Sequence, residues 1–145
     1  MLTACNLRTE DSLRSQFGLH KNSIVQILEM QRQDQNVVRI APSFTWLDTD
    51  MSWPRKNIGF SEARWAQYRA LFQEAKIADG IVSRDGAVWY YASSIGLTVG
   101  GKSRGYVYSE NPLTPVVASF DHCIAGEGSC YIRLEEHWYI FQEVS

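Results

Sequence analysis

The sequence predicts a single α+β domain, in which two to three helices pack on a curved antiparallel β-sheet formed mainly by the C-terminal half. Its 145 residues and 45% hydrophobic content suit one domain with one core. Apolar residues at helical spacing dominate the first half, and short β-forming segments separated by turn residues dominate the second. We expect a tether over residues 1–8 and the domain over 9–145.

Two segments have helical signals in the first third of the chain. Thr9 is followed by acidic residues, which favours a helix start there, and Gly18 predicts a stop or break. From residue 22 to residue 33, Ile24, Ile27, Leu28 and Gln31 follow helical spacing. We therefore expect a helix over 22–33.

The strongest helix signal begins at Ser61, a residue suited to capping a helix N-terminus. Trp65, Tyr68 and Phe72 then recur on one helical face, and Gly80 predicts the end of the segment. A long loop rich in Asp, Pro and Gly is expected before this helix, over residues 47–59.

Strands are predicted wherever β-forming residues lie between turn signals. Residues 37–46 are expected to form one strand at a sheet edge or bulge, because Pro42 interrupts it. Residues 84–86 and 135–137 predict hairpin turns. The remaining predicted strands are 81–83, 87–93, 105–109, 115–120, 131–134 and 138–142.

Charge and hydropathy exclude several classes of partner. The net charge is −2, with 14 basic and 16 acidic residues spread along the chain, so we expect no nucleic acid partner. No apolar stretch reaches the roughly 20 residues that a membrane-spanning helix needs.

The string from Gly96 to Ser103 matches the G-x-x-x-x-G-K-S pattern of a nucleotide-binding P-loop. A P-loop requires a helix directly after its lysine, so that helix amides can hold the phosphates. Residues 104–109 are instead β-forming. The sequence therefore favours a glycine-rich hairpin turn over nucleotide binding, and we expect no cofactor.

No metal site is predicted either. His20, His122 and His137 lack the spacing of a helical zinc pair. The segment 48–59 resembles the opening of a calcium loop but lacks the glycine and the bidentate glutamate that such a loop needs.

The sequence Leu2-Thr3-Ala4-Cys5 resembles the lipobox of bacterial lipoproteins. The resemblance implies that Cys5 is lipidated and becomes the mature N-terminus, and Asn6 after it favours the outer membrane. No charged segment and apolar run of about 7–15 residues precede these four residues, so a signal peptide is missing from this sequence. The alternative is a chance match in a cytosolic protein.

Cys123 and Cys130 are close enough in sequence to form a small disulfide loop. Such a bond is permitted in the periplasm and is rare in the cytosol, so it favours the same compartment as the lipobox. The alternative is a pair of reduced, unrelated thiols.

The stretches 96–115 and 131–140, together with the lipobox, are similar to a pattern in small uncharacterised envelope lipoproteins of Gram-negative bacteria. The resemblance implies a periplasmic location and a rough fold. It implies no activity and no catalytic residue.

Two classes of function remain. The first is a non-enzymatic protein of the immunity or inhibitor type, which binds an unidentified envelope protein through the exposed aromatics Trp46, Trp53, Tyr106 and Tyr108. The alternative is a small envelope hydrolase that uses carboxylates among Glu110, Asp121, Glu135 and Glu136, provided that two of them converge in a cleft. Asp121, His122 and Cys123 are consecutive, so as strand residues they cannot form a catalytic relay.

Overall fold

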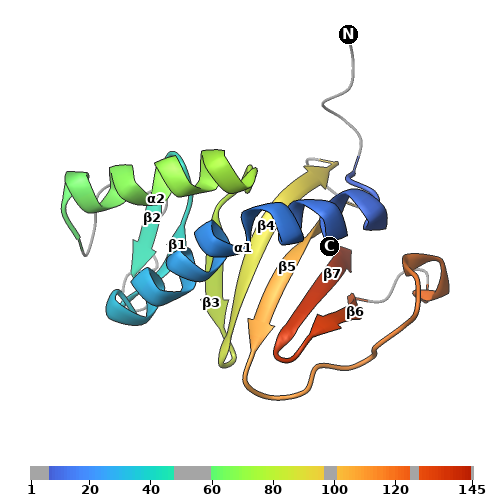
Figure 1. The fold of residues 1–145 in the computed structure, drawn as a ribbon. Helices are drawn as coiled ribbons and strands as arrows, with labels where there is room; N and C mark the ends of the chain where they lie inside the picture. The colour runs from blue at the N-terminus through green and yellow to red at the C-terminus, as the bar shows by residue number, and fades with distance from the viewer. Residues whose placement is uncertain (1–6, 48–59, 97–100, 125–127, 145) are drawn as a thin grey trace, which may run out of the picture.

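Two α-helices cover one face of a seven-stranded antiparallel sheet in the computed structural model (Figure 1), which confirms the predicted α+β class. The structure describes residues 7–47, 60–96, 101–124 and 128–144. The strand order is β2-β1-β3-β4-β5-β7-β6. Within the described residues, no helix is both long enough and apolar enough to span a membrane.

The first helix, α1, spans Glu10–Gln33 and is kinked at His20, where the backbone leaves helical geometry. Thr9 caps it as predicted, because its hydroxyl accepts a hydrogen bond from the Ser12 amide. The predicted break is present but displaced by two residues: Gly18 itself is helical, and the backbone kinks at His20 (φ −114°, ψ 19°). Apolar residues on both sides of the kink pack against the sheet, and this packing holds the helix together through the glycine.

The second helix, α2, spans Glu62–Ala75, with Ser61 as the predicted cap. It ends at Lys76, which adopts the left-handed conformation, and not at Gly80 as the sequence suggested. Gly80 has a φ of 79°, and a Cβ there would lie 2.1 Å from the carbonyl oxygen of Ile40. The glycine therefore permits β1 to approach closely; it does not end the helix.

The segment predicted as one strand over 37–46 is a hairpin of two short strands, β1 (Val37–Ile40) and β2 (Thr45–Leu47). Pro42 lies in the connection between them, where it removes no hydrogen bond from the sheet. The remaining strands are β3 (Ile81–Arg84), β4 (Ala87–Ile95), β5 (Lys102–Ser109), β6 (Ser129–Glu135) and β7 (Trp138–Val144).

Residues 115–120 do not form the predicted strand. Val116 makes one isolated parallel bridge to Tyr131 on the outer edge of β6, and a short 3₁₀ helix, η1, follows over Phe120–His122. The long connection from β5 leads to β6 at the edge, and β7 then returns between them. The C-terminal half is therefore antiparallel, but it is not a simple meander.

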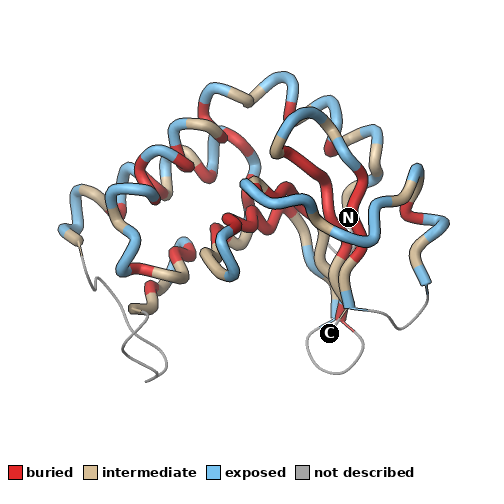
Figure 2. The backbone as a smooth tube through the Cα atoms, turned by 90° about the horizontal axis from the view of Figure 1, so that it is seen from below, coloured by how far each residue is buried: buried red, intermediate tan, exposed pale blue. Residues whose placement is uncertain are grey.

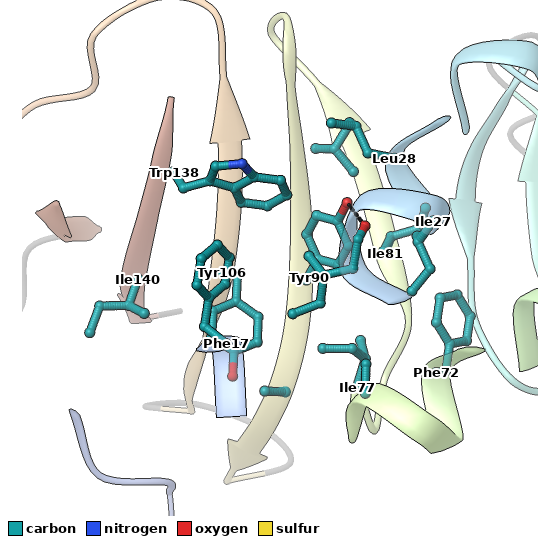
Figure 3. Packing of buried hydrophobic residues seen from close by; sticks show 14 of the residues in the cluster. Phe17, Ile27, Leu28, Phe72, Ile77, Ile81, Tyr90, Tyr106, Trp138 and Ile140 are labelled. Carbon is teal, nitrogen blue, oxygen red and sulfur yellow. Dashed lines mark hydrogen bonds between the residues drawn. The ribbon is translucent and has the colours of Figure 1, made fainter. Parts of the chain in front are cut away.

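Most of the aromatic side chains lie in the core. Between the helices and the sheet, the hydroxyls of two fully buried tyrosines donate to carbonyls of α1: Tyr90 to Ile24 at 2.9 Å and Tyr106 to Leu13 at 3.0 Å. Figure 3 shows Tyr90 and Tyr106 among the apolar residues of this cluster. The opposite face of the sheet has its own buried cluster around Trp89. Figure 2 shows buried positions in the strands as well as along the helices.

Candidate functional site

A groove of about 330 Å³ opens at the end of the sheet where β3 turns into β4. We call it the distal groove. Three structural elements meet there: the last turns of α1, the β3–β4 hairpin over residues 83–88, and the C-terminal end of β5. Its lining includes Leu28, Gln31, Arg32, Ser83, Tyr108 and Glu110.

Two polar groups in the distal groove lack protein partners. Gln31 is only 6% exposed, and its side-chain amide forms no hydrogen bond with the described residues. The Ser83 hydroxyl oxygen is likewise buried without a partner among the described residues. Buried Leu28 and Val88 lie beside them. Because an unsatisfied buried polar group is costly, the Ser83 hydroxyl marks a place where a ligand can supply a missing hydrogen bond, and the Gln31 amide lines the same groove.

Tyr108 forms the aromatic wall of the distal groove. Its hydroxyl donates to Glu110 at 2.7 Å and accepts from Arg32 at 3.3 Å. The hydrogen bond to Glu110 raises the pKa of Tyr108, so the ring remains neutral. Its ring packs edge-on against Trp138 and lies under the Arg32 guanidinium. The half-buried tyrosine is therefore held in one orientation, as an interface anchor would be.

The other aromatic candidates do not join Tyr108. Tyr106 is fully buried under α1, so the expectation that it is exposed is wrong; strand alternation and the hydrogen bond to Leu13 turn its ring into the core. Trp46 is half-buried on β2, opposite Arg39 at the far edge of the sheet. Trp53 lies outside the described residues.

The carboxylates considered for hydrolysis come from two regions of the structure. Glu110 lines the distal groove, whereas Asp121 belongs to η1 near the other end of the sheet. Glu135 ion-pairs with Lys21 at 2.7 Å, and the neighbouring Glu136 lies 3.3 Å from His137. Asp121 is therefore apart from Glu110, and Glu135 is engaged in an ion pair of its own.

The P-loop string lies between two strands. Lys102 and Ser103 open β5 and pair with Ile95 and Ser94 of β4 in an antiparallel register. A strand therefore follows the lysine, and the helix N-terminus that would hold phosphates is not there. Among the described residues, no group of three or more His, Cys, Asp or Glu side chains is arranged to bind a metal ion.

Cys123 and Cys130 form a disulfide, with their Cα atoms 6.0 Å apart. The bond joins the segment after η1 to the start of β6, and it is compatible with an extracytoplasmic domain. Cys5, the predicted lipidation site, lies outside the described residues.

Sequence reasoning did not identify Gln31, Arg32 or Ser83 as site residues. A local signal existed for Gln31, which occupies an apolar position of the helical stripe in α1. A polar side chain at such a position needs a hydrogen-bond partner, either within the protein or in a ligand. No comparable signal exists for Ser83, whose environment depends on the packing of α1 against the β3–β4 hairpin.

No family model, curated protein or solved structure matches this chain.

Proposed function

We propose that this chain is the folded domain of a Gram-negative envelope lipoprotein, anchored through a lipid on Cys5, that binds another protein through the distal groove. More specifically, the protein would be of the immunity or inhibitor type. It would lie on the periplasmic side of a bacterial membrane, with the outer membrane favoured. The observation that carries the binding function is the unpartnered Gln31 amide, set between apolar side chains and the Tyr108 wall.

A peptide segment matches this groove chemically. Each peptide bond offers one N–H donor and one C=O acceptor, and the Gln31 amide offers one acceptor and donors in return. The Ser83 hydroxyl, which lines the same groove, adds a further donor and acceptor. Arg32 and Glu110 at the rim add one charge of each sign, which favours a partner segment that carries both.

The binding function is tested by photo-crosslinking in cells of the native host. A benzophenone amino acid replaces exposed Gln35 at the groove rim, and a control variant carries it at exposed Gln26 on α1. We expect one discrete adduct from position 35 and none from position 26. Equal adducts from both positions, or none from position 35, contradict the proposal.

The variant Gln31→Leu separates binding from folding. Leucine keeps a side chain of similar size and removes no hydrogen bond to the described residues, so stability should be unchanged or higher. The adduct from position 35 should nevertheless be lost, because leucine cannot form the hydrogen bonds that the Gln31 amide offers to the partner. An adduct of unchanged yield in the Gln31→Leu background would exclude the distal groove as the binding site.

The anchor is tested separately, in the protein expressed from its native gene. Metabolic labelling with an alkyne fatty acid should label the protein, and Cys5→Ser should abolish the label. A mature protein that retains Met1 and carries no lipid would refute the anchor and leave the groove experiment unaffected.

A further inference from the structure

The chain is fixed to the sheet from Arg8 onward. The Arg8 amide donates to the Ser93 hydroxyl at 3.1 Å, and the Arg104 guanidinium donates to the Arg8 carbonyl at 2.8 Å. Thr9 then caps α1. Cys5 is three residues before Arg8, and three extended residues span at most about 11 Å. A lipid on Cys5 would therefore hold this end of the domain close to the bilayer.

The disulfide lies at the same end of the sheet as Arg8. Ser93 pairs with Arg104, Arg104 pairs with Gln142, and Gln142 pairs with Cys130, in one row across β4, β5, β7 and β6. Cys130 on β6 lies two strands across the sheet from Arg104 on β5, and two spacings between neighbouring strands amount to about 10 Å. The disulfide and the attachment point of the tether therefore form one face of the molecule.

This face carries two exposed aliphatic side chains. Ile124, next to Cys123, is 69% exposed, and Val116, which bridges to β6, is 50% exposed. Ile124 borders a mostly apolar pocket of about 260 Å³, which is also lined by Val117 and the disulfide; Val116 lies next to Val117, outside the lining. We call Ile124, Val116 and this pocket the disulfide patch. The third large exposed hydrophobic side chain of the described residues, Leu19, lies on α1.

The distal groove lies at the other end of the same strands. Ala87, which lines the groove, is six residues along β4 from Ser93, and six strand residues correspond to about 20 Å. In Figure 1 the β3–β4 turn is at the lower end of the sheet, opposite the end of β4 that leads toward β5.

We propose that the disulfide patch docks on the bilayer surface when Cys5 carries its lipid, so that the distal groove faces away from the membrane. This inference rests on the proposed anchor at Cys5. Two aliphatic side chains are too few to bind a membrane on their own, but a tether this short makes their contact with the bilayer intramolecular and raises its effective concentration. The short tether therefore selects one orientation of the domain.

The orientation is tested on the domain coupled through Cys5 to a maleimide phospholipid in nanodiscs of phosphatidylethanolamine and phosphatidylglycerol. Cys5 is the one cysteine outside the disulfide, so the coupling is selective. A gadolinium-chelating lipid in the disc broadens nearby amide signals in the NMR spectrum. We expect broadening at Ile124, Val116 and Ser129 to exceed that at Asp85 and Gly86 several-fold. Equal broadening at both ends, or the reverse order, overturns the proposal.

Two variants identify the contact. Ile124→Ser should reduce the difference in broadening between the two ends, whereas Leu19→Ser, which removes an equally exposed aliphatic side chain elsewhere, should leave it unchanged. A flexible Gly-Ser insertion between Asn6 and Leu7 should also reduce the difference, because a longer tether lowers the effective concentration of the patch at the bilayer. If Ile124→Ser and Leu19→Ser behave alike, the disulfide patch does not contact the lipid.

Failure of this proposal is distinguishable from failure of the anchor. The coupling is chemical, so the docked orientation is measured whether or not cells lipidate Cys5. If the uncoupled domain instead forms a dimer in sedimentation experiments, and Ile124→Ser abolishes that dimer, the patch belongs to a second copy of this chain and the bilayer assignment is overturned.

Discussion

The hydroxyl of Tyr68 in α2 donates a 2.6 Å hydrogen bond to the carboxylate of Asp34, the residue that ends α1. The same carboxylate oxygen accepts from Arg64 at 2.9 Å. Tyr68 is fully buried, and both burial and the adjacent carboxylate raise its pKa. One acidic side chain therefore joins the end of the first helix to the start and the middle of the second.

Asp34→Ala should destabilise the domain by about 2–3 kcal/mol, because it leaves a buried tyrosine hydroxyl unpaired and removes a charge-assisted hydrogen bond. The melting temperature should fall by roughly 5–10 °C for a chain of this size. Glu29→Ala, an exposed substitution on the same helix, is the matched control and should change stability by less than about 0.5 kcal/mol. Similar losses in both variants would contradict the role of Asp34.

Glu10 links the start of α1 to η1 and should make stability depend on acid pH. Burial acts to raise the pKa of Glu10, but hydrogen bonds from the Phe120 amide at 2.6 Å and the Ser119 hydroxyl at 2.8 Å outweigh it, so the pKa lies below its usual 4.5. A lowered carboxyl pKa stabilises the fold above the unfolded pKa, and this contribution is lost as the pH falls through the folded pKa.

Glu10→Gln should therefore be less stable than wild type at neutral pH, and the difference should shrink as the pH falls below 4.5. Urea unfolding of both proteins across the acid range measures this difference. A gap that stays constant with pH would mean that ionisation of Glu10 does not contribute to folding.

Gly105 should tolerate no side chain. A Cβ at this position in β5 would lie 1.7 Å from the carbonyl oxygen of Tyr90 and 2.9 Å from the amide nitrogen of Ala92, both of which are backbone atoms of β4. Gly105→Ala should thus cost about 3 kcal/mol or more, or prevent folding. Circular dichroism and thermal unfolding report the effect.

Gly18→Ala is the matched control for Gly105→Ala. A Cβ at Gly18 meets nothing within 4 Å, and the residue lies inside α1. Alanine should stabilise this helix by about 0.5–1 kcal/mol. A loss of stability at Gly18 would indicate that α1 is not continuous through this residue.

The disulfide predicts a defined count of reactive thiols. In the unlipidated protein, denatured without reductant, one of the three cysteines should react with a maleimide, and all three should react after reduction. Mass spectrometry of the labelled protein gives the count. The ring is small, so its reduction should destabilise the fold by only about 2–3 kcal/mol. Three reactive thiols before reduction would refute the bond.

Much of the secondary structure is predictable because its signals are local. The starts of both helices follow from Thr9 and Ser61, each of which caps its own helix through a neighbouring amide. The hairpin turns before Ala87 and Trp138 follow from turn residues between β-forming segments. An error arose where packing overrides local preference: residues 115–120 contribute one bridge in place of a strand.

The sequence by itself determined the fold class, because helical and strand periodicities and caps act over a few residues. Only the tertiary structure decided the distal groove. Arg32 and Tyr108 are 76 residues apart in the chain, and they meet because α1 crosses the sheet toward the end of β5. The Gln31 amide becomes part of a candidate binding site only because Ser83 and Leu28 line the same groove. These residues come together through long-range packing of α1 against the β3–β4 hairpin.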